Sequence, residues 1–234
     1  MSERSDEVAA RLADVRRRIA SACVAAGRDP GEVTLVAVTK FFPASDVRIL
    51  ADLGVTDVGE NRHQEAEAKA AECADLGLTW HFIGGLQSNK AAAVATYADV
   101  VESVDRAKLV TGLQRGAHER SHTVDVLLQV SLDPPDAGAA RSGADPADLD
   151  ALAGAVQAAD RLRLRGLMAV APLGEDPATA FDRLAVVRRR FLHDHPGADL
   201  LSAGMSGDLD DAIRVGATHV RVGSAVLGSR PPVK

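Results

Sequence analysis

The hydrophobic and polar positions of the chain follow two periods, one typical of helices and one typical of buried strands. Residues 5–26 carry apolar side chains three or four positions apart, which predicts an amphipathic helix that stops at Gly27. Residues 33–40, VTLVAVTK, then form a near-continuous apolar run rich in β-branched side chains. Such a run predicts a strand that is buried on both faces, as in a parallel sheet.

The same exchange of strand and helix patterns repeats to the end of the chain. Short apolar runs predict further strands at residues 56–61, 79–84, 99–105, 124–133, 164–172, 198–206 and 219–228. Helical patterns lie between them at 46–53, 62–76, 88–97, 106–120, 147–160, 178–192 and 208–215. Eight strands that alternate with helices predict a (β/α)₈ TIM-type barrel with an additional amino-terminal helix. An open doubly wound sheet is disfavoured because no GxGxxG fingerprint follows the first strand.

One connection differs in composition from the rest. Residues 134–146, PPDAGAARSGADP, are rich in proline, glycine and alanine and predict a long mobile loop after the fifth strand. No other shift in composition divides the chain, so we expect residues 1–234 to form a single domain.

Composition excludes several functional classes. The formal net charge is −6 and no long basic run is present, which argues against nucleic acid as a partner, because such binding needs clustered Lys and Arg. Cys23 and Cys73 are isolated in predicted helices, so neither a disulfide framework nor a metal site is expected. The charged amino terminus lacks the apolar core of a signal peptide, and no segment has the roughly 18 apolar residues that span a membrane. We therefore expect a cytoplasmic protein with no membrane partner, and a monomer, because no apolar surface stripe stands out.

Residues that could carry chemistry gather where the predicted strands end. Active sites of such barrels form at the carboxyl ends of the strands. The first predicted strand ends on Lys40, although an ammonium group is rarely buried without a partner. Candidate residues at the second, seventh and eighth strand ends are Glu60, Asn61, Ser206, Gly207, Arg221, Gly223 and Ser224.

The last two strand ends together predict a phosphate site. In GMSGD (204–208), small residues let the backbone approach an anion, and the helix expected to begin near Asp208 would supply amide groups and its positive dipole end. VRVGS (220–224) adds a second set of amides. Loops after the seventh and eighth strands often bind phosphate in these barrels. GMSGD alone is equally consistent with a structural turn.

A lysine beside a phosphate site suggests imine chemistry. A lysine in a partly desolvated pocket has a lowered pKa and can attack an aldehyde. Pyridoxal 5′-phosphate (PLP) carries an aldehyde and a phosphate in one molecule. The residues alone leave open that Lys40 is a solvent-facing strand end or a point charge for phosphate.

Five motifs, in order, resemble those of the pyridoxal phosphate homeostasis protein family, which includes the proline synthase co-transcribed homologue of eukaryotes. They are VAVTK (36–40), VGENRHQE (58–65), WHFIGGLQSNK (80–90), GLMAV (166–170) and LSAGMSGDLDDAIRVGATHVRVGSAVLG (201–228). The resemblance implies a barrel like the amino-terminal domain of alanine racemase. It also implies a non-catalytic protein of intracellular vitamin B6 homeostasis, which holds PLP as an internal aldimine for buffering or for delivery to PLP-dependent apoenzymes.

The resemblance also implies a role for each site residue. Lys40 matches the Schiff-base lysine, Asn61 a pocket residue near the cofactor, and Arg221 the arginine that faces the pyridine nitrogen. The phosphate-binding positions of the family are matched by Ser206, Gly207, Gly223 and Ser224. A permanently charged guanidinium disfavours a proton on the ring nitrogen, so the ring would stabilise a carbanion poorly.

The chain departs from the family pattern at three positions. Gly85 stands where the family often has proline, Ser131 where it usually has asparagine, and Arg141 where it often has lysine. Roles borrowed for the loop after the fifth strand are therefore in doubt, whereas the cofactor site is unaffected.

Two enzymatic alternatives remain. A PLP-dependent amino-acid racemase needs an acid or base opposite the lysine, and the sole tyrosine, Tyr97, lies in a predicted helix. His81 and His219 could act as bases, although both fit ordinary strand histidines. A phosphate-binding barrel enzyme without PLP, such as a sugar-phosphate isomerase, would depend on Glu60 paired with His81.

Overall fold

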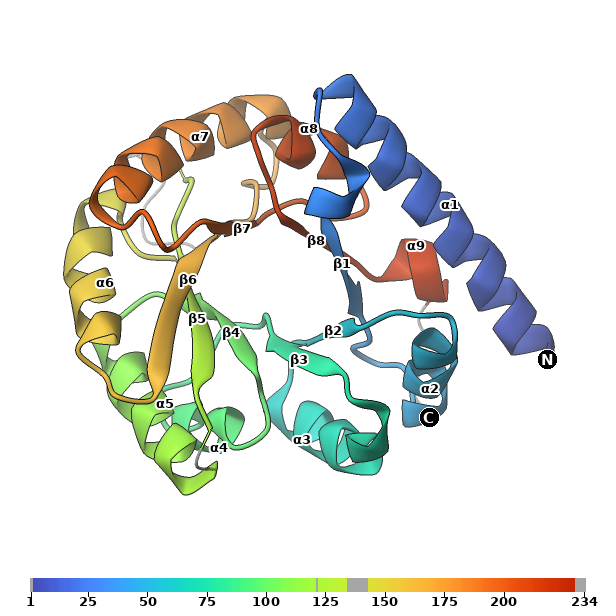
Figure 1. Cartoon of the computed structure of the whole chain (residues 1–234), viewed down its shortest axis with the longest axis horizontal. Helices are drawn as coiled ribbons and strands as arrows, with labels where there is room; N and C mark the ends of the chain where they lie inside the picture. Colours follow the sequence, from blue (N-terminus) through green and yellow to red (C-terminus); the bar gives the residue numbers. More distant parts are fainter. Residues whose placement is uncertain (1, 121, 134–142, 230–234) are drawn as a thin grey trace.

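The computed structural model describes residues 2–120, 122–133 and 143–229, and these form a closed barrel of parallel strands (Figure 1). Each strand pairs with the next along the chain, and β8 closes the barrel on β1. The strands are β1 (Thr34–Val38), β2 (Asp57–Glu60), β3 (Thr79–Phe82), β4 (Val100–Val104), β5 (Val124–Gln129), β6 (Leu162–Met168), β7 (Leu200–Ser202) and β8 (His219–Val222). The barrel architecture predicted from the alternating pattern is confirmed.

Helices surround the barrel, as Figure 1 shows. They are α1 (Glu3–Ala25), α2 (Ala44–Asp52), α3 (His63–Glu72), α4 (Ala91–Ala95), α5 (Ala107–Arg120), α6 (Leu149–Gln157), α7 (Pro177–Asp194), α8 (Leu209–Arg214) and α9 (Ser224–Leu227). Short 3₁₀ turns are formed by η1 (Pro30–Glu32), η2 (Ala74–Leu76) and η3 (Pro146–Asp148).

The leading helix predicted from apolar spacing is α1, which packs along α8 and α9. Its buried side chains include Leu12 and Ile19, which join Ile213 of α8 and Val226 of α9 in one core cluster. This packing places α1 against the two elements that follow β7 and β8.

The predicted strand 219–228 is too long. β8 ends at Val222, and the apolar residues after Gly223 form the short helix α9 instead. Gly223 leaves the extended conformation with φ −110° and ψ −83°, and Val226 and Leu227 are buried from this helical turn. A continuous apolar run cannot reveal such a change, because a buried helical turn and a buried strand share the same composition.

The predicted loop at 134–146 lies partly outside the described residues, which omit 134–142 and therefore Arg141. At its described end, Ala144 forms an isolated parallel bridge with Val130, and η3 follows. Ser131 lies beside this bridge, because its N–H donates to the carbonyl of Ala144 at 2.9 Å. The end of the predicted loop is therefore tied back to the strand that it follows.

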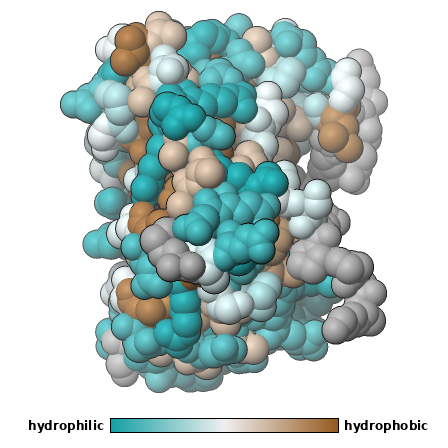
Figure 2. All heavy atoms as spheres, turned by 90° about the vertical axis from the view of Figure 1, so that its right-hand side faces the viewer, coloured by the Kyte–Doolittle hydropathy of each residue, from teal (hydrophilic) through white to brown (hydrophobic). Residues whose placement is uncertain are grey.

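Within the described ranges, no helix is both long and apolar enough to cross a membrane. Figure 2 shows the face around α1 and α2, where hydrophilic side chains cover most of the surface. Hydrophobic side chains appear on this face only in small separate groups.

Candidate functional site

A pocket of about 390 Å³ lies at the carboxyl ends of β1, β2, β7 and β8. This volume falls in the range of roughly 300–1,000 Å³ that is usual for small-molecule sites. The pocket is lined by Val38, Lys40, Phe41, Phe42, Asn61, Ile83, Val170, Met205, Ser206, Gly207, Arg221, Gly223, Ser224 and Gly228. All residues that the sequence singled out for cofactor binding belong to this lining, so the fold brings them together from four separate strand ends.

Lys40 lies in a tight turn just beyond β1. The strand ends at Val38, and the N–H of Phe42 donates to the carbonyl of Thr39 at 3.0 Å. Phe41 has φ 71°, a left-handed conformation that bulky residues rarely adopt. Both Lys40 and Phe41 line the pocket. Strained backbone of this kind is typical of ligand sites, where the surrounding structure holds it in place.

Asn61 lines the pocket directly after β2, and its side-chain oxygen is an orphaned acceptor. The Oδ1 atom is buried and has no hydrogen-bond partner within the described chain. Gly84 permits this placement, because a Cβ there would lie 2.2 Å from the carbonyl oxygen of Asn61. A buried polar atom without a partner costs free energy, which favours a ligand that donates a hydrogen bond at this position.

The turn between β7 and α8 is shaped by Gly204 and Asp208. Gly204 has φ 91°, and a Cβ on it would lie 2.6 Å from the Cβ of Ala212. The carboxylate of Asp208 accepts a hydrogen bond from the N–H of Met205 at 2.6 Å. Arg18 of α1 supports the same turn from outside, since its guanidinium donates to the carbonyl of Ser206. Asp208 and Arg18 thus hold the turn by hydrogen bonds to its backbone, and Ser206 in this turn lines the pocket.

Gly223 brings the start of α9 close to β1. A Cβ at this position would lie 3.3 Å from the carbonyl oxygen and 3.4 Å from the Cβ of Val38, which is tight contact. Both Gly223 and Ser224 belong to the pocket lining. Two short helices, α8 and α9, therefore begin beside the pocket, where free backbone amides favour an anion.

Arg221 lies almost fully buried, with 4% of its surface exposed, at the end of a hydrogen-bond chain that crosses the barrel interior. Its Nη2 donates to the carbonyl of Ala169 at 2.9 Å, and its Nη1 donates to the hydroxyl of Ser202 at 2.6 Å. That hydroxyl donates in turn to Oε2 of Glu102 at 2.6 Å.

The chain of hydrogen bonds continues from Glu102 to residues of β3 and β2. Oε1 of Glu102 lies 2.8 Å from Nδ1 of His81, and Nε2 of His81 lies 2.9 Å from Oδ1 of Asp57. This chain of hydrogen bonds thus links β2, β3, β4, β7 and β8. Ser202 and Glu102 were not among the residues singled out from the sequence. A carboxylate inside the apolar run VVESV was the available signal for Glu102.

Opposite charges alternate along this chain. Burial would lower the pKa of His81, but its hydrogen bonds to Asp57 and Glu102 outweigh burial and raise the pKa to about 9. Burial would raise the pKa of Glu102, but the hydrogen bond from His81 and the charge of Arg221 lower it to about 2. At neutral pH the Glu102 carboxylate therefore lies between two cations. Burial lowers the pKa of Arg221, against the Glu102 carboxylate, yet a guanidinium remains charged in proteins.

The structure does not form the alternative pair of Glu60 and His81. Glu60 accepts hydrogen bonds from Thr39 and Lys69, whereas His81 is bonded to two other carboxylates. Tyr97 stacks on the ring of His63, with 5.9 Å between centroids, and lies outside the residues that line the pocket. Glu60 and His81 are thus bound to other partners, and His219 also lies outside the pocket lining, with its Nδ1 2.9 Å from the hydroxyl of Thr218.

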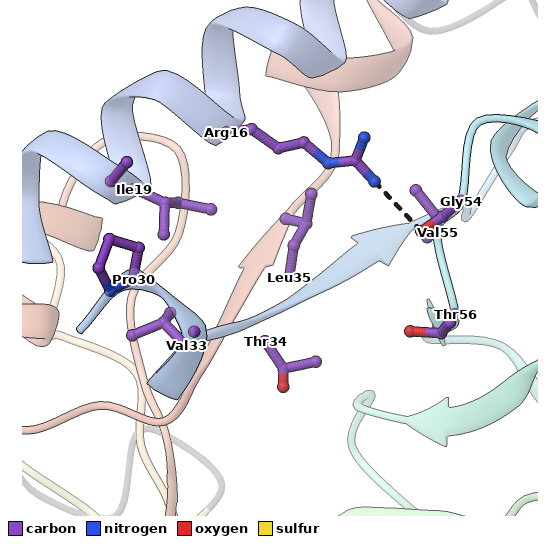
Figure 3. A pocket seen from close by; sticks show the side chains of 11 residues that line it. Arg16, Ile19, Pro30, Val33, Thr34, Leu35, Gly54, Val55 and Thr56 are labelled. Carbon is purple, nitrogen blue, oxygen red and sulfur yellow. Dashed lines mark hydrogen bonds between the residues drawn. The ribbon is translucent and has the colours of Figure 1, made fainter.

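A second hollow, of about 430 Å³, lies at the amino-terminal ends of β1 and β2, beneath α1 (Figure 3). Arg16 is the one charged side chain among the described residues that line it. Its guanidinium donates to the carbonyls of Leu53 and Gly54, both at 3.2 Å, and Figure 3 draws the bond to Gly54. Arg16 thus provides hydrogen-bond donors for the carbonyl groups that follow α2. The lining of this hollow offers no other charged side chain for binding or catalysis among the described residues.

Comparison with known proteins identifies relatives along nearly the whole chain. The family model described as "Alanine racemase, N-terminal domain" matches residues 11–231. A pyridoxal phosphate homeostasis protein of Mycobacterium tuberculosis is 43% identical over 244 aligned residues, which cover 97% of this chain and 95% of the relative.

Solved structures give the same picture. PipY of Synechococcus elongatus, solved with PLP bound, is 37% identical, with a TM-score of 0.80 over 94% of this chain and 100% of that protein. The alanine racemase of Clostridium difficile has a TM-score of 0.71 at 12% identity, over 98% of this chain and 58% of the racemase. At this low identity, the similarity to the racemase is a similarity of fold alone.

Proposed function

Because the chain belongs to the pyridoxal phosphate homeostasis protein family, we propose that it binds PLP around Lys40 and acts as a carrier in intracellular vitamin B6 homeostasis. The observation that carries the proposal is the convergence of a lysine, an arginine and two glycine–serine turns on one pocket of small-molecule size. The proposal extends to the whole chain, residues 1–234, as one PLP-binding domain.

The chemistry of the lining fits both ends of PLP. When bound, PLP supplies an aldehyde, which condenses with a primary amine and loses water. Lys40 is the one lysine among the described lining residues and would hold this end. The phosphate would be held by backbone amides and hydroxyls at the starts of α8 and α9, from Ser206, Gly207, Gly223 and Ser224.

Two further residues would hold the ring. Arg221 keeps its charge and would disfavour a proton on the ring nitrogen, since like charges repel. Asn61 offers an unpartnered Oδ1 that would accept a hydrogen bond from the cofactor. A ring without that proton stabilises a carbanion poorly, which disfavours amino-acid chemistry.

We therefore propose that the protein carries PLP without an obligatory catalytic reaction. Racemisation requires a proton donor on the face opposite the lysine. Neither Tyr97 nor His81 is among the described residues that line the pocket, and both ring nitrogens of His81 are engaged by carboxylates. These contacts support a carrier over the racemase alternative.

The open mouth of the pocket supports transfer to partners. Val170 and Met205 line the pocket and still expose 38% and 39% of their surface. An open site suits the release of cofactor to PLP-dependent apoenzymes, whereas catalysis benefits from the exclusion of water. We propose that the protein does this as a monomer.

Gel filtration after incubation with PLP tests the proposal. The protein is expected to retain PLP, to restore the activity of an added PLP-dependent apoenzyme, and to form no D-alanine from L-alanine. Complete loss of PLP on the column would contradict binding. Steady formation of D-alanine would contradict the non-catalytic role and support the racemase.

A further inference from the structure

The turn that carries Lys40 needs support from outside itself. Phe41, the next residue, has φ 71°, and a phenylalanine in the left-handed region is strained. Such a conformation persists only where neighbouring groups hold it. The groups that do so here come from α3, a helix whose residues lie outside the pocket lining.

Lys69 of α3 is the centre of this support, and it is buried, with 6% of its surface exposed. Its ammonium group donates to the carbonyl of Thr39 at 2.7 Å, to Oε1 of Glu60 at 2.6 Å and to Oε1 of Glu65 at 2.8 Å. An ammonium has three donors, so these contacts account for all of them.

The two carboxylates extend the contacts to both sides of Lys40. Oε1 of Glu65 also accepts the N–H of Phe41 at 2.5 Å. Oε1 of Glu60 also accepts the hydroxyl of Thr39 at 2.6 Å. The residue before Lys40 and the residue after it are thus both bound to one ion cluster, formed by Lys69, Glu60 and Glu65.

The charges make Lys69 the essential member of this cluster. Burial raises the pKa of Glu60, against the lowering effect of the Lys69 charge, and its Oε2 has no partner within the described chain. Without the Lys69 ammonium, Glu60 and Glu65 would be two neighbouring carboxylates with no cation between them. Like charges repel, so the contact that holds Phe41 would be weakened together with the contact to Thr39.

We infer that Lys69 is a positioning residue, which fixes the strained turn so that the Lys40 amine is presented to the aldehyde of PLP. The inference rests on the proposed function. Lys69 acts on the backbone around Lys40 and lies outside the lining residues, so it should affect the covalent attachment of PLP and leave the phosphate and ring contacts intact.

Two ligands separate these effects. PLP has the aldehyde, whereas pyridoxine 5′-phosphate has a primary alcohol in its place and shares the ring and the phosphate. Lys69→Met is expected to slow the attachment of PLP and to weaken its equilibrium binding by about tenfold or more, since small misplacements of a reacting group have effects of this size. Binding of pyridoxine 5′-phosphate is expected to stay within about twofold of wild type.

Matched variants control for general damage. Lys108→Met removes an exposed lysine of α5 and is expected to behave as wild type with both ligands. Glu65→Ala removes the acceptor of the Phe41 N–H and should reproduce the selective loss, so it tests the inference even if Lys69→Met does not fold.

The outcomes are distinct. A selective loss of PLP binding in Lys69→Met, or in Glu65→Ala where Lys69→Met does not fold, supports the positioning role. Unchanged PLP binding in a folded Lys69→Met, or an equal loss for both ligands, overturns it. Wild-type protein that does not attach PLP would contradict the proposed function itself, and this is established before the variants are compared.

Discussion

The guanidinium of Arg221 and the carboxylate of Glu102 lie 3.8 Å apart in the barrel interior, and the Ser202 hydroxyl is hydrogen-bonded to both. Arg221 belongs to the pocket lining, whereas Glu102 lies deeper on β4. The buried carboxylate therefore compensates a buried cation that faces the candidate cofactor site. Removing one member of a buried ion pair leaves the other charge uncompensated.

Glu102→Gln is expected to lower the free energy of unfolding by about 3–5 kcal/mol, because both Arg221 and His81 lose their shared anion. Denaturant titration measures this change. Glu119→Gln, at an exposed position of α5, is the matched control and should stay within about 0.5 kcal/mol of wild type. A loss below about 1 kcal/mol in Glu102→Gln would show that the chain of hydrogen bonds contributes little to the free energy of unfolding.

The charge of His81 predicts how stability depends on pH. The pKa of His81 rises on folding from 6.5 to about 9, so the stabilisation is complete below pH 6.5 and is lost as the pH rises through about 9. The free energy of unfolding of wild type should therefore exceed that of His81→Gln by an amount that decreases between about pH 6.5 and 9.

A control for this experiment is His118→Gln, which removes an exposed histidine of α5. It should follow the wild-type curve across the same pH range. A difference between wild type and His81→Gln that stays constant from pH 6 to 10 would contradict the assignment of a protonated His81.

Gly204 and Gly207 lie in one turn, but alanine is expected to reduce stability at Gly204 and not at Gly207. Gly204→Ala is expected to reduce stability by about 1–3 kcal/mol, because φ is 91° and the new Cβ would meet Ala212 at 2.6 Å. Gly207→Ala meets nothing within 4 Å and should change stability by less than about 0.5 kcal/mol. Thermal unfolding of the two variants checks the contrast, and equal losses would contradict the geometry of this turn.

The sequence contained enough information for the architecture and the family. Each strand is a short apolar run and each helix has its own period, so the barrel was predictable, and both the fold and the family resemblance are confirmed. Residues 223–228 were assigned wrongly to a strand, because the turn at Gly223 depends on its close approach to Val38, which is a tertiary contact.

The supporting residues were harder to find. Glu65 and Lys69 are four positions apart in an Ala- and Glu-rich helix, a spacing that is typical of a solvent-exposed ion pair. Only the packing of α3 against β2 and the Lys40 turn makes Lys69 buried and Glu65 half-buried. Likewise, Glu102 has no local partner in sequence, and its contacts come from β3, β7 and β8. Long-range pairing of this kind is invisible to patterns read along one segment.

The site at which PLP becomes attached tests the proposed role of Lys40 most directly. Wild-type protein is incubated with PLP, reduced with borohydride, digested and analysed by mass spectrometry. A single modified lysine, Lys40, is expected, and no adduct at equal PLP concentration in Lys40→Ala. Stoichiometric modification of another lysine, or an adduct of equal yield in Lys40→Ala, would contradict this role.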